Sequence, residues 1–245
     1  MKPEMERVLR PRDQARQSYN SMSRWYDLFT GSEKQFTDIG IQMLDVQSDE
    51  FVLEIGCGTG HALVEFAGKG GKVIAIDISE GMIKVARENI RGNSVGLCQA
   101  DGLSLPFSDE QFDAAFLSFT LELFDTPDMP RVLTECHRIL KVDGRIGVVS
   151  LAKQDTSTVR VYEWFHRRMP KVVDCRPIYV QSVLREAKFD TQRSTTKTMW
   201  GLPVEIVAAT KQEIASSPWS RYERDDRSLD PSTSSGHRST SGSSQ

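Results

Sequence analysis

Short apolar runs alternate with helical repeats of apolar residues along most of the chain. Phe51–Ile55 has the length and composition of a buried strand, and a glycine-rich turn and a helical stretch follow it. We predict strands over the ranges Phe51–Ile55, Lys72–Ile76, Val95–Gln99, Ala114–Phe119, Arg145–Leu151, 191–200 and Val204–Lys211. We predict helices over the ranges His61–Ala67, Gly81–Asn89, Pro130–Leu140, Thr158–Met169 and Tyr179–Ala187. This alternation is typical of an α/β fold built on a parallel sheet.

Two further helical patterns precede the first strand. Asp13–Phe29 carries apolar residues at spacings of three and four, and Ser32–Leu44 gives a second helix. We expect residues 1–48 to form a helical cap that lies across the ligand edge of the sheet. The alternative interpretation is that these helices only pack on the core.

The last part of the chain differs in composition from the rest. Residues 213–245 are rich in Ser, Thr, Gly, Arg and Asp, and Ser228–Gln245 is of low complexity. Such a segment cannot bury enough apolar surface to offset the entropy of ordering. We therefore expect one α/β domain over residues 49–212 and a disordered tail over residues 213–245.

Charge and cysteine usage narrow the classes of partner. The net charge of −3 and the pI near 5.9 argue against a nucleic-acid groove, which needs clustered Lys and Arg. The chain has no apolar run of the roughly 18 residues that a spanning helix needs, and its N-terminus does not resemble a secretory signal. The four cysteines are widely spaced, so we expect no metal site, reduced thiols and a cytoplasmic location.

The first strand leads into three glycines at alternate positions, Gly56, Gly58 and Gly60. Glycines let the backbone turn sharply there and let a ligand approach it closely. The dinucleotide fingerprint Gly-x-Gly-x-x-Gly fails at His61, where its third glycine would stand. An acid, Glu54, also precedes the glycines, and a carboxylate repels a pyrophosphate but suits a cation. S-adenosylmethionine (AdoMet), which carries a sulfonium and an ammonium, is such a ligand.

These residues resemble the first motif of the class I AdoMet-dependent methyltransferases, Glu-x-Gly-x-Gly-x-Gly. The resemblance implies a Rossmann-like seven-stranded sheet that is mostly parallel, with an antiparallel terminal hairpin and helices on both faces. It also implies AdoMet as the cofactor. The segment Tyr19–Asp27 further resembles the N-terminal helix of the quinone-biosynthesis C-methyltransferases, the menaquinone and ubiquinone group. In that group an aromatic residue from this helix closes over the cofactor, and Tyr19 and Tyr26 are the matching positions.

Two acids follow the next two strands. Asp77 ends the second strand, near the interval of about 20 residues at which an acid meets ribose hydroxyls. The alternative is that Asp77 is the N-cap of the following helix. Asp101 follows the third strand, and the resemblance implies that it accepts from the adenine amino group; the alternative is an ordinary Asp-Gly turn. The expected cofactor-binding residues are Glu54, Gly56, Cys57, Gly58, Gly60, Asp77, Ile78, Met82, Asp101, Gly102, Ser118, Tyr19 and Tyr26.

The acceptor side carries a weaker signal. The end of the fourth strand, with Ser118 and Phe119, should border the transferred methyl group. His166 is the one candidate for a catalytic base, and the alternative is a solvent-facing helical histidine. Arg176 could hold an anionic acceptor or pair with a carboxylate. The expected acceptor-binding residues are Trp25, Phe119, Tyr162 and Arg176, and Tyr26, Trp164 and Phe165 complete an aromatic lining whose alternative role is to fill the core.

An aromatic lining suits a flat, apolar ring, so the sequence favours a small-molecule or lipidic acceptor, with quinol or phenol C- or O-methylation as the specific hypothesis. A lipidic acceptor would bring the protein into transient contact with a membrane, without an integral segment. Two other interpretations remain at this point. One is a methyltransferase-fold protein that binds or regulates without catalysis. The other is a nicotinamide oxidoreductase, against which Glu54 and His61 count.

Two minor features complete the analysis. Leu140–Gly144 resembles the Leu-Lys-Pro-Gly-Gly turn of the family with the proline and the first glycine replaced, which leaves its turn type open. Glu135 and Arg138, three residues apart on a predicted helix, are interpreted as a surface pair.

Overall fold

A computed structural model of the protein describes residues 31–90, 95–169 and 175–213. Its centre is a seven-stranded sheet in the order β3-β2-β1-β4-β5-β7-β6, in which the first five strands of this order are parallel and β7 runs antiparallel to both β5 and β6. The strands are β1 (Phe51–Ile55), β2 (Lys72–Asp77), β3 (Val95–Gln99), β4 (Phe112–Ser118), β5 (Leu140–Leu151), β6 (Phe189–Met199) and β7 (Leu202–Lys211). The predicted mostly parallel sheet with an antiparallel terminal hairpin is confirmed.

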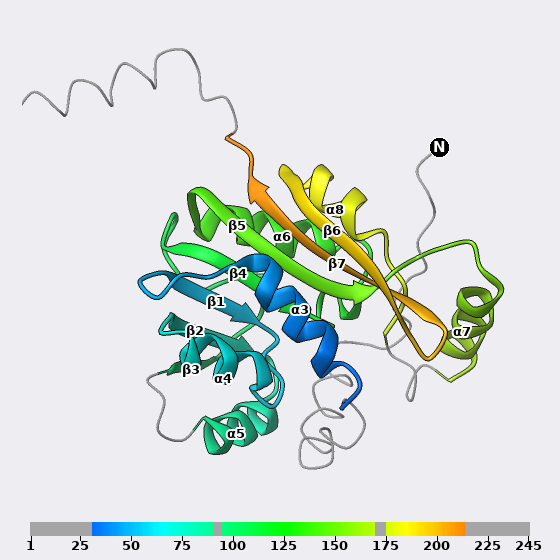
Figure 1. The fold of residues 1–245 in the computed structure, drawn as a ribbon, viewed down its shortest axis with the longest axis horizontal. Coiled ribbons are helices and arrows are strands. Elements are labelled where there is room, and N and C mark those ends of the chain that lie inside the picture. Colours follow the sequence, from blue (N-terminus) through cyan, green and yellow to red (C-terminus); the bar gives the residue numbers. More distant parts are fainter. Residues whose placement is uncertain (1–30, 91–94, 170–174, 214–245) are drawn as a thin grey trace, which may run out of the picture. The chain divides into compact units, whose positions relative to one another are not determined.

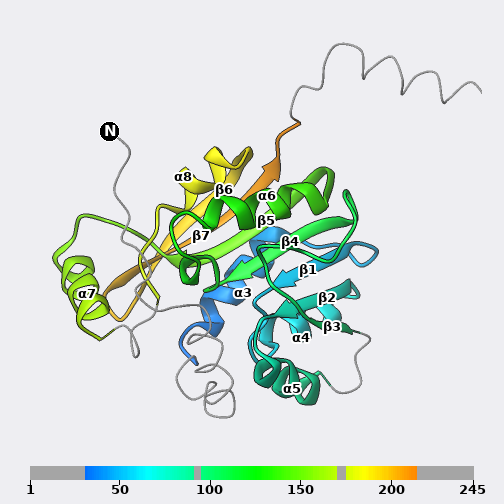
Figure 2. The same cartoon turned by 180° about the vertical axis from the view of Figure 1, so that it is seen from behind.

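Helices cover both faces of the sheet, as predicted. They are α3 (Lys34–Leu44), α4 (His61–Gly68), α5 (Glu80–Asn89), α6 (Met129–Ile139), α7 (Ser157–Arg168) and α8 (Val180–Glu186), with a 3-10 turn η1 (Leu121–Leu123). Helix α3 crosses one face in Figure 1, and α6 and α8 lie on the other face, seen in Figure 2. Side chains alternate between the two faces along each strand, so Val52 joins the core under α3, α4 and α5, while Leu53 joins the core under α6 and α8.

Element bounds differ from the predictions by a few residues. Strand β4 begins at Phe112 and not at Ala114, and β5 begins at Leu140 because Phe112 pairs with Leu140 before the register shifts. The predicted helix Asp13–Phe29 lies outside the described residues, as does nearly all of the predicted tail 213–245. In the described part of the chain, no helix is long and apolar enough to cross a membrane.

The turn between α6 and the body of β5 answers the question left open by the sequence. Asp143 adopts a left-handed conformation with φ of 62°. This is the position at which the family motif has its first glycine, and Asp tolerates that conformation better than most residues. The turn therefore keeps a backbone that favours glycine even though the glycine is absent.

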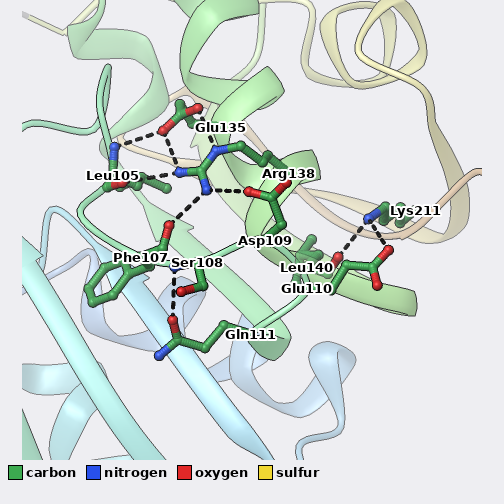
Figure 3. Close-up of polar contacts among 10 residues, drawn as sticks. All are labelled: Leu105, Phe107, Ser108, Asp109, Glu110, Gln111, Glu135, Arg138, Leu140 and Lys211. Carbon is green, nitrogen blue, oxygen red and sulfur yellow. Dashed lines mark hydrogen bonds and ion pairs between the residues drawn. The ribbon is translucent and has the colours of Figure 1, made fainter.

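The predicted pair of Glu135 and Arg138 forms on α6, and it has further contacts that the sequence did not indicate. Both side chains are half-buried, and Glu135 Oε2 accepts a hydrogen bond of 2.8 Å from the Leu105 amide. Arg138 donates to the Phe107 carbonyl at 2.7 Å and to the Asp109 carboxylate at 2.8 Å (Figure 3). Together, these contacts hold the loop between β3 and β4 against α6. This loop begins beside the site described next.

Candidate functional site

A cavity of about 180 Å³ opens where β1, β2 and β4 end, far larger than the roughly 10–15 Å³ that a single water needs. This is the carboxyl edge of the sheet, where ligands of open α/β folds bind. The predicted site residues that line it are Glu54, Gly56, Cys57, Gly58, Asp77, Ile78, Met82, Asp101, Gly102, Ser118 and Phe119. Residues from five separate segments of the sequence thus meet around one space.

The glycine-rich loop forms one wall because its backbone turns in the left-handed region. Gly56 has φ of 73°, and a Cβ on it would lie 2.4 Å from Thr120 Cγ2. Gly58 has φ of 52°. Gly60 has a different role, since it does not line the cavity; a Cβ on it would lie 3.2 Å from Ala86 Cβ of α5, so it allows close packing between helices. The loop therefore needs glycine for conformation and for two close approaches.

Asp77 anchors this loop through both of its carboxylate oxygens. Oδ2 accepts from the Gly58 amide at 3.0 Å, and Oδ1 accepts from the Ser79 amide at 2.8 Å. Ser79, and not Asp77, is the N-cap of α5, because its Oγ accepts from the Met82 amide at 3.1 Å. The N-cap interpretation of Asp77 is therefore wrong. Burial raises the pKa of Asp77 to about 6, against the opposing effect of its backbone hydrogen bonds.

Glu54 is buried at the end of β1 and lines the cavity. Its Oε2 has no hydrogen-bond partner within the described part of the chain. Burial, followed by the negative charge of Asp77, raises its pKa well above the ordinary value. Unpaired buried acceptors are rare in folded proteins and costly. This oxygen therefore marks a place that suits a cationic or hydrogen-bond-donating ligand group.

Asp101 and Gly102 form the opposite wall. Asp101 lines the cavity, and its Oδ1 also accepts from the Leu103 amide at 3.0 Å. The Asp-Gly turn and the position in the site are therefore not alternatives, since the same residue has both. A Cβ on Gly102 would lie 3.1 Å from the ring of Phe124, another cavity residue, which explains the small residue here.

Helix α3 contributes residues that the sequence did not single out. Thr37 lines the cavity, and its hydroxyl lies 2.7 Å from that of Ser118 at the end of β4. At the next position of α3, Asp38 Oδ1 lies 2.8 Å from His61 Nε2 at the start of α4. These contacts hold α3 to both sides of the site. The periodic pattern of the helix reports its apolar face only, so it gives no sign of these polar contacts.

Other cavity residues missed by the sequence analysis are Glu33, Lys34, Thr59, Thr120, Leu123 and Phe124. Three of them follow β4, where Phe119 adopts a left-handed conformation with φ of 48° while its side chain is buried. Backbone strain at a non-glycine residue is often found at functional sites. The strain turns the chain at Phe119, so that Thr120 closes over the glycine-rich loop and donates to the Gly56 carbonyl at 3.3 Å.

The structure does not bring the predicted acceptor residues of the second half of the chain to the cavity. Tyr162 is half-buried on α7, and its hydroxyl donates to the Cys175 carbonyl at 3.2 Å. His166 is buried on the inner face of α7, which contradicts the solvent-facing interpretation. Trp164 and Phe165 are exposed on the outer face of α7, so their prediction as pocket or core residues is wrong. Trp25, Tyr19 and Tyr26 lie outside the described residues.

Arg176 is buried behind the cavity and not in it. It donates to the carbonyl of Phe124 at 2.7 Å. Its charge acts on Glu122, a fully buried acid of η1 whose Oε1 accepts from the Leu151 amide at 3.3 Å. Burial raises the pKa of Glu122 to about 7 despite hydrogen bonds and the charge of Arg176. The only sequence signal for Glu122 is an acid between two leucines.

Comparisons with known proteins agree with this geometry. A model of the methyltransferase domain matches residues 52–144, which span the glycine-rich loop and the cavity acids Glu54, Asp77 and Asp101. A demethylmenaquinone methyltransferase of Corynebacterium kroppenstedtii is 32% identical over 173 residues, which cover 66% of this chain and 71% of that protein. The chain belongs to the class I AdoMet-dependent methyltransferases.

Other methyltransferases extend the comparison. A demethylmenaquinone methyltransferase of Thermobifida fusca is 37% identical over 146 residues, 56% of this chain and 61% of that protein. The chain spans about three fifths of the length of several such relatives. The magnesium protoporphyrin IX methyltransferase of Synechocystis, solved with bound S-adenosylhomocysteine, has a TM-score of 0.68 at 16% identity and covers 82% of this chain and all of that protein. At that identity the likeness shows the methyltransferase fold alone.

The cavity fits the cofactor of the methyltransferase family. The unpaired oxygen of Glu54 suits a cationic group, and the glycine-rich loop leaves its backbone open to close approach. Asp77 keeps acceptor capacity on both oxygens beyond the two amides that it already binds. The described ranges contain no cluster of three or more His, Cys, Asp or Glu that could hold a metal.

Proposed function

We propose that this protein transfers the methyl group of AdoMet to a small or lipidic acceptor. The observation that carries the proposal is the meeting of Glu54, Asp77 and Asp101 with the glycine-rich loop around one cavity at the carboxyl edge of the sheet. Family membership supports the same reaction. The relatives are longer than the matched region, so the activity is argued from the site and not from their names.

Each acid has a distinct role in the proposed complex. Glu54 balances the positive charge of the amino-acid end of the cofactor, because its buried oxygen lacks a partner in the described ranges. Asp77 accepts from the two ribose hydroxyls, for which an ionised carboxylate is a stronger acceptor than an amide. Asp101 accepts from the adenine amino group. The bound cofactor supplies an electrophilic methyl group on a sulfonium, and the protein's contribution is to align the acceptor and exclude water.

A quinol or phenol is the proposed acceptor, methylated on carbon or oxygen. Several relatives carry names of menaquinone and ubiquinone biosynthesis enzymes, which supports this class. The apolar wall at the end of β4, with Phe119, Leu123 and Phe124, supports a flat, apolar ring. We assign no general base, because His166 does not line the cavity. Alignment and the leaving sulfonium carry the reaction in this proposal.

The test is an acceptor panel. The protein is incubated with AdoMet and, in separate reactions, a demethylated quinol, a soluble phenol, a small amine and a fatty acid, and S-adenosylhomocysteine is measured. We expect turnover with the quinol or the phenol. Turnover only with the amine or the fatty acid contradicts the acceptor class and leaves methyl transfer standing. No turnover with any acceptor, in protein shown to bind AdoMet, favours a binding or regulatory role.

A further inference from the structure

Helix α7 departs from the usual amphipathic pattern at several positions. Its inner face buries Glu163 and His166 beside Val159, and Glu163 forms an ion pair with Lys153. Its outer face exposes Val161 and Trp164, which are 55% and 51% accessible. A helix on the surface of a water-soluble protein normally places its charged residues on the solvent-facing side. The outer face of α7 is therefore built to meet an apolar environment.

The exposed apolar side chains form one cluster. Seven large apolar side chains are exposed in the described part of the chain, and five of them lie on α7, directly after it or at the β6–β7 turn: Val161, Trp164, Phe165, Met169 and Trp200. The turn approaches α7, since a Cβ on Gly201 would lie 3.8 Å from Thr158 Cγ2. Trp200, in a left-handed conformation at the tip of the turn, is 74% accessible. We call these five residues the apolar surface.

Basic residues flank the apolar surface. Arg160, Arg167 and Arg168 are exposed on α7, although the whole chain has a net charge of −3. Exposed Trp and Phe together with Arg are the composition that binds the interface of an anionic bilayer. Tryptophan and arginine also occur at protein–protein interfaces, but three exposed arginines on one helix of a chain with net charge −3 match an anionic surface. The charge pattern thus favours a lipid surface as the occupant.

The location of the apolar surface connects it to the cavity. Helix α7 follows the carboxyl end of β5, and Leu151 at that end pairs with Val204 at the start of β7, so the Trp200 turn lies at the same edge of the sheet. The cavity opens at the carboxyl ends of β1, β2 and β4, which is also this edge (Figures 1 and 2). A surface that docks on a membrane here would bring the site toward acceptors dissolved in the bilayer.

We propose that α7 and the Trp200 turn dock the protein on an anionic lipid surface. Docking on a membrane would serve the enzyme if its acceptor is lipidic, so this proposal rests in part on the proposed function. Its test needs neither cofactor nor acceptor, however, so the two can fail separately. Vesicle binding without methyl transfer would leave docking standing, and methyl transfer to a soluble phenol without vesicle binding would leave the proposed function standing.

The experiment is co-sedimentation of the full chain with phosphatidylcholine vesicles, with and without about one third phosphatidylglycerol. We expect binding to the anionic vesicles, and a loss of at least about tenfold in affinity for the triple variant W164S/F165S/W200S, because binding scales with buried apolar area. The double variant R167Q/R168Q should lose about fivefold per arginine and only with anionic vesicles.

Matched controls separate docking from folding. Val161→Ser changes an exposed valine on α7 and should weaken binding, whereas Val64→Ser changes an exposed valine on α4 and should not. R185Q/R193Q removes two exposed arginines elsewhere and should also leave binding unchanged. Thermal unfolding identifies any variant that has lost its fold. Equal binding by the Val161→Ser and Val64→Ser variants, or no binding of the wild type to anionic vesicles, overturns the proposal. A wild-type dimer that Val161→Ser dissociates also overturns it, and assigns the surface to a second copy.

Discussion

Two regions at the carboxyl edge of the sheet, the cavity and helix α7, place their polar and apolar side chains in opposite ways. At the cavity, polar groups stand at strand ends where a ligand meets them: Asp77 binds its own loop, and Glu54 holds an unpaired buried oxygen. At α7, Glu163 and His166 turn inward, whereas Trp164 and Phe165 face out beside exposed arginines. The first arrangement belongs to a site for a small polar molecule, and the second to a surface for an apolar environment. Under the proposed function, this arrangement would place a polar cofactor and an apolar acceptor at the same edge of one sheet.

The two regions also differ in how locally they are specified. The glycine-rich loop of the cavity is specified locally, because Glu54, Gly56 and Gly58 are close together in the sequence, although the cavity as a whole gathers residues from several segments. The region of η1, α7 and Arg176 depends on contacts between segments far apart in the chain. Substitutions at the cavity should therefore alter the conformation of the glycine-rich loop and the affinity for the cofactor. Substitutions in the region of η1, α7 and Arg176 should alter the pH dependence of stability and the binding of lipid.

The largest effect is expected from Gly56→Ala. The new Cβ would lie 2.4 Å from Thr120 Cγ2, and Gly56 has φ of 73°. Left-handed strain of about 1–2 kcal/mol and overpacking of about 1–3 kcal/mol should together lower the free energy of unfolding by about 2–5 kcal/mol. Denaturant unfolding measures this, with Gly68→Ala as the control because no atom lies within 4 Å of its Cβ position. Adding Thr120→Ala should restore the steric part only; no recovery would show that the close approach is not what excludes a side chain.

Next in size is the pH dependence created by Glu122. Its folded pKa of about 7 exceeds the ordinary value of 4.5, so between these pH values the unfolded chain releases a proton that the folded chain keeps. Stability should fall as pH rises through this window and level off above about pH 7, by up to about 3 kcal/mol. Glu122→Gln should make the slope clearly shallower and leave the part due to Asp77 and Glu54, whose pKa values are also raised, while Glu88→Gln, at an exposed position, should keep the full slope. Urea unfolding from pH 4.5 to 8 measures the slopes; parallel profiles for wild type and Glu122→Gln would contradict the assignment.

A smaller effect, confined to the cavity, is expected from Asp77→Ala. Loss of hydrogen bonds to an ionised group costs about 1.5–3 kcal/mol, which corresponds to a roughly ten- to hundredfold weaker affinity for AdoMet. Asp49→Ala, at an exposed position outside the cavity, is the control and should bind as the wild type does. Binding is measured by fluorescence or calorimetry on protein whose fold is checked by circular dichroism. Unchanged affinity in folded Asp77→Ala would remove this residue from the site.

The smallest effect concerns the turn before the body of β5. Asp143 has φ of 62°, a conformation that costs a non-glycine residue about 1 kcal/mol and glycine almost nothing. Asp143→Gly should therefore raise the free energy of unfolding by up to about 1 kcal/mol. The greater conformational entropy of glycine in the unfolded chain reduces this gain. Asp143→Ala is the comparison and should be the least stable of the three. A glycine variant less stable than the alanine variant would contradict this account of the turn.

The sequence predicted the elements that local chemistry decides. Every predicted strand forms, because short apolar runs mark the inner strands and alternation marks the terminal hairpin, and Asp77 was found through its spacing from the glycines. What it missed depends on tertiary contacts. Thr37 reaches Ser118 across 81 positions, and no periodicity reports such a contact. Trp164 and Phe165, which face outward, were predicted to line the pocket or fill the core. The helical spacing of apolar residues identifies an apolar face, but it does not say whether that face packs on the protein or meets another apolar environment.

Calorimetric titration of AdoMet from pH 5 to 8, beside titrations of S-adenosylhomocysteine and NAD, tests the central claim that this cavity is an AdoMet site organised by Asp77. The ribose hydroxyls require the ionised carboxylate, whose pKa is raised to about 6 in the free protein. We predict AdoMet binding that weakens as pH falls through about 6, a much flatter profile in Asp77→Asn, and no binding of NAD. Absence of AdoMet binding across the range, or tighter binding of NAD, would contradict the account.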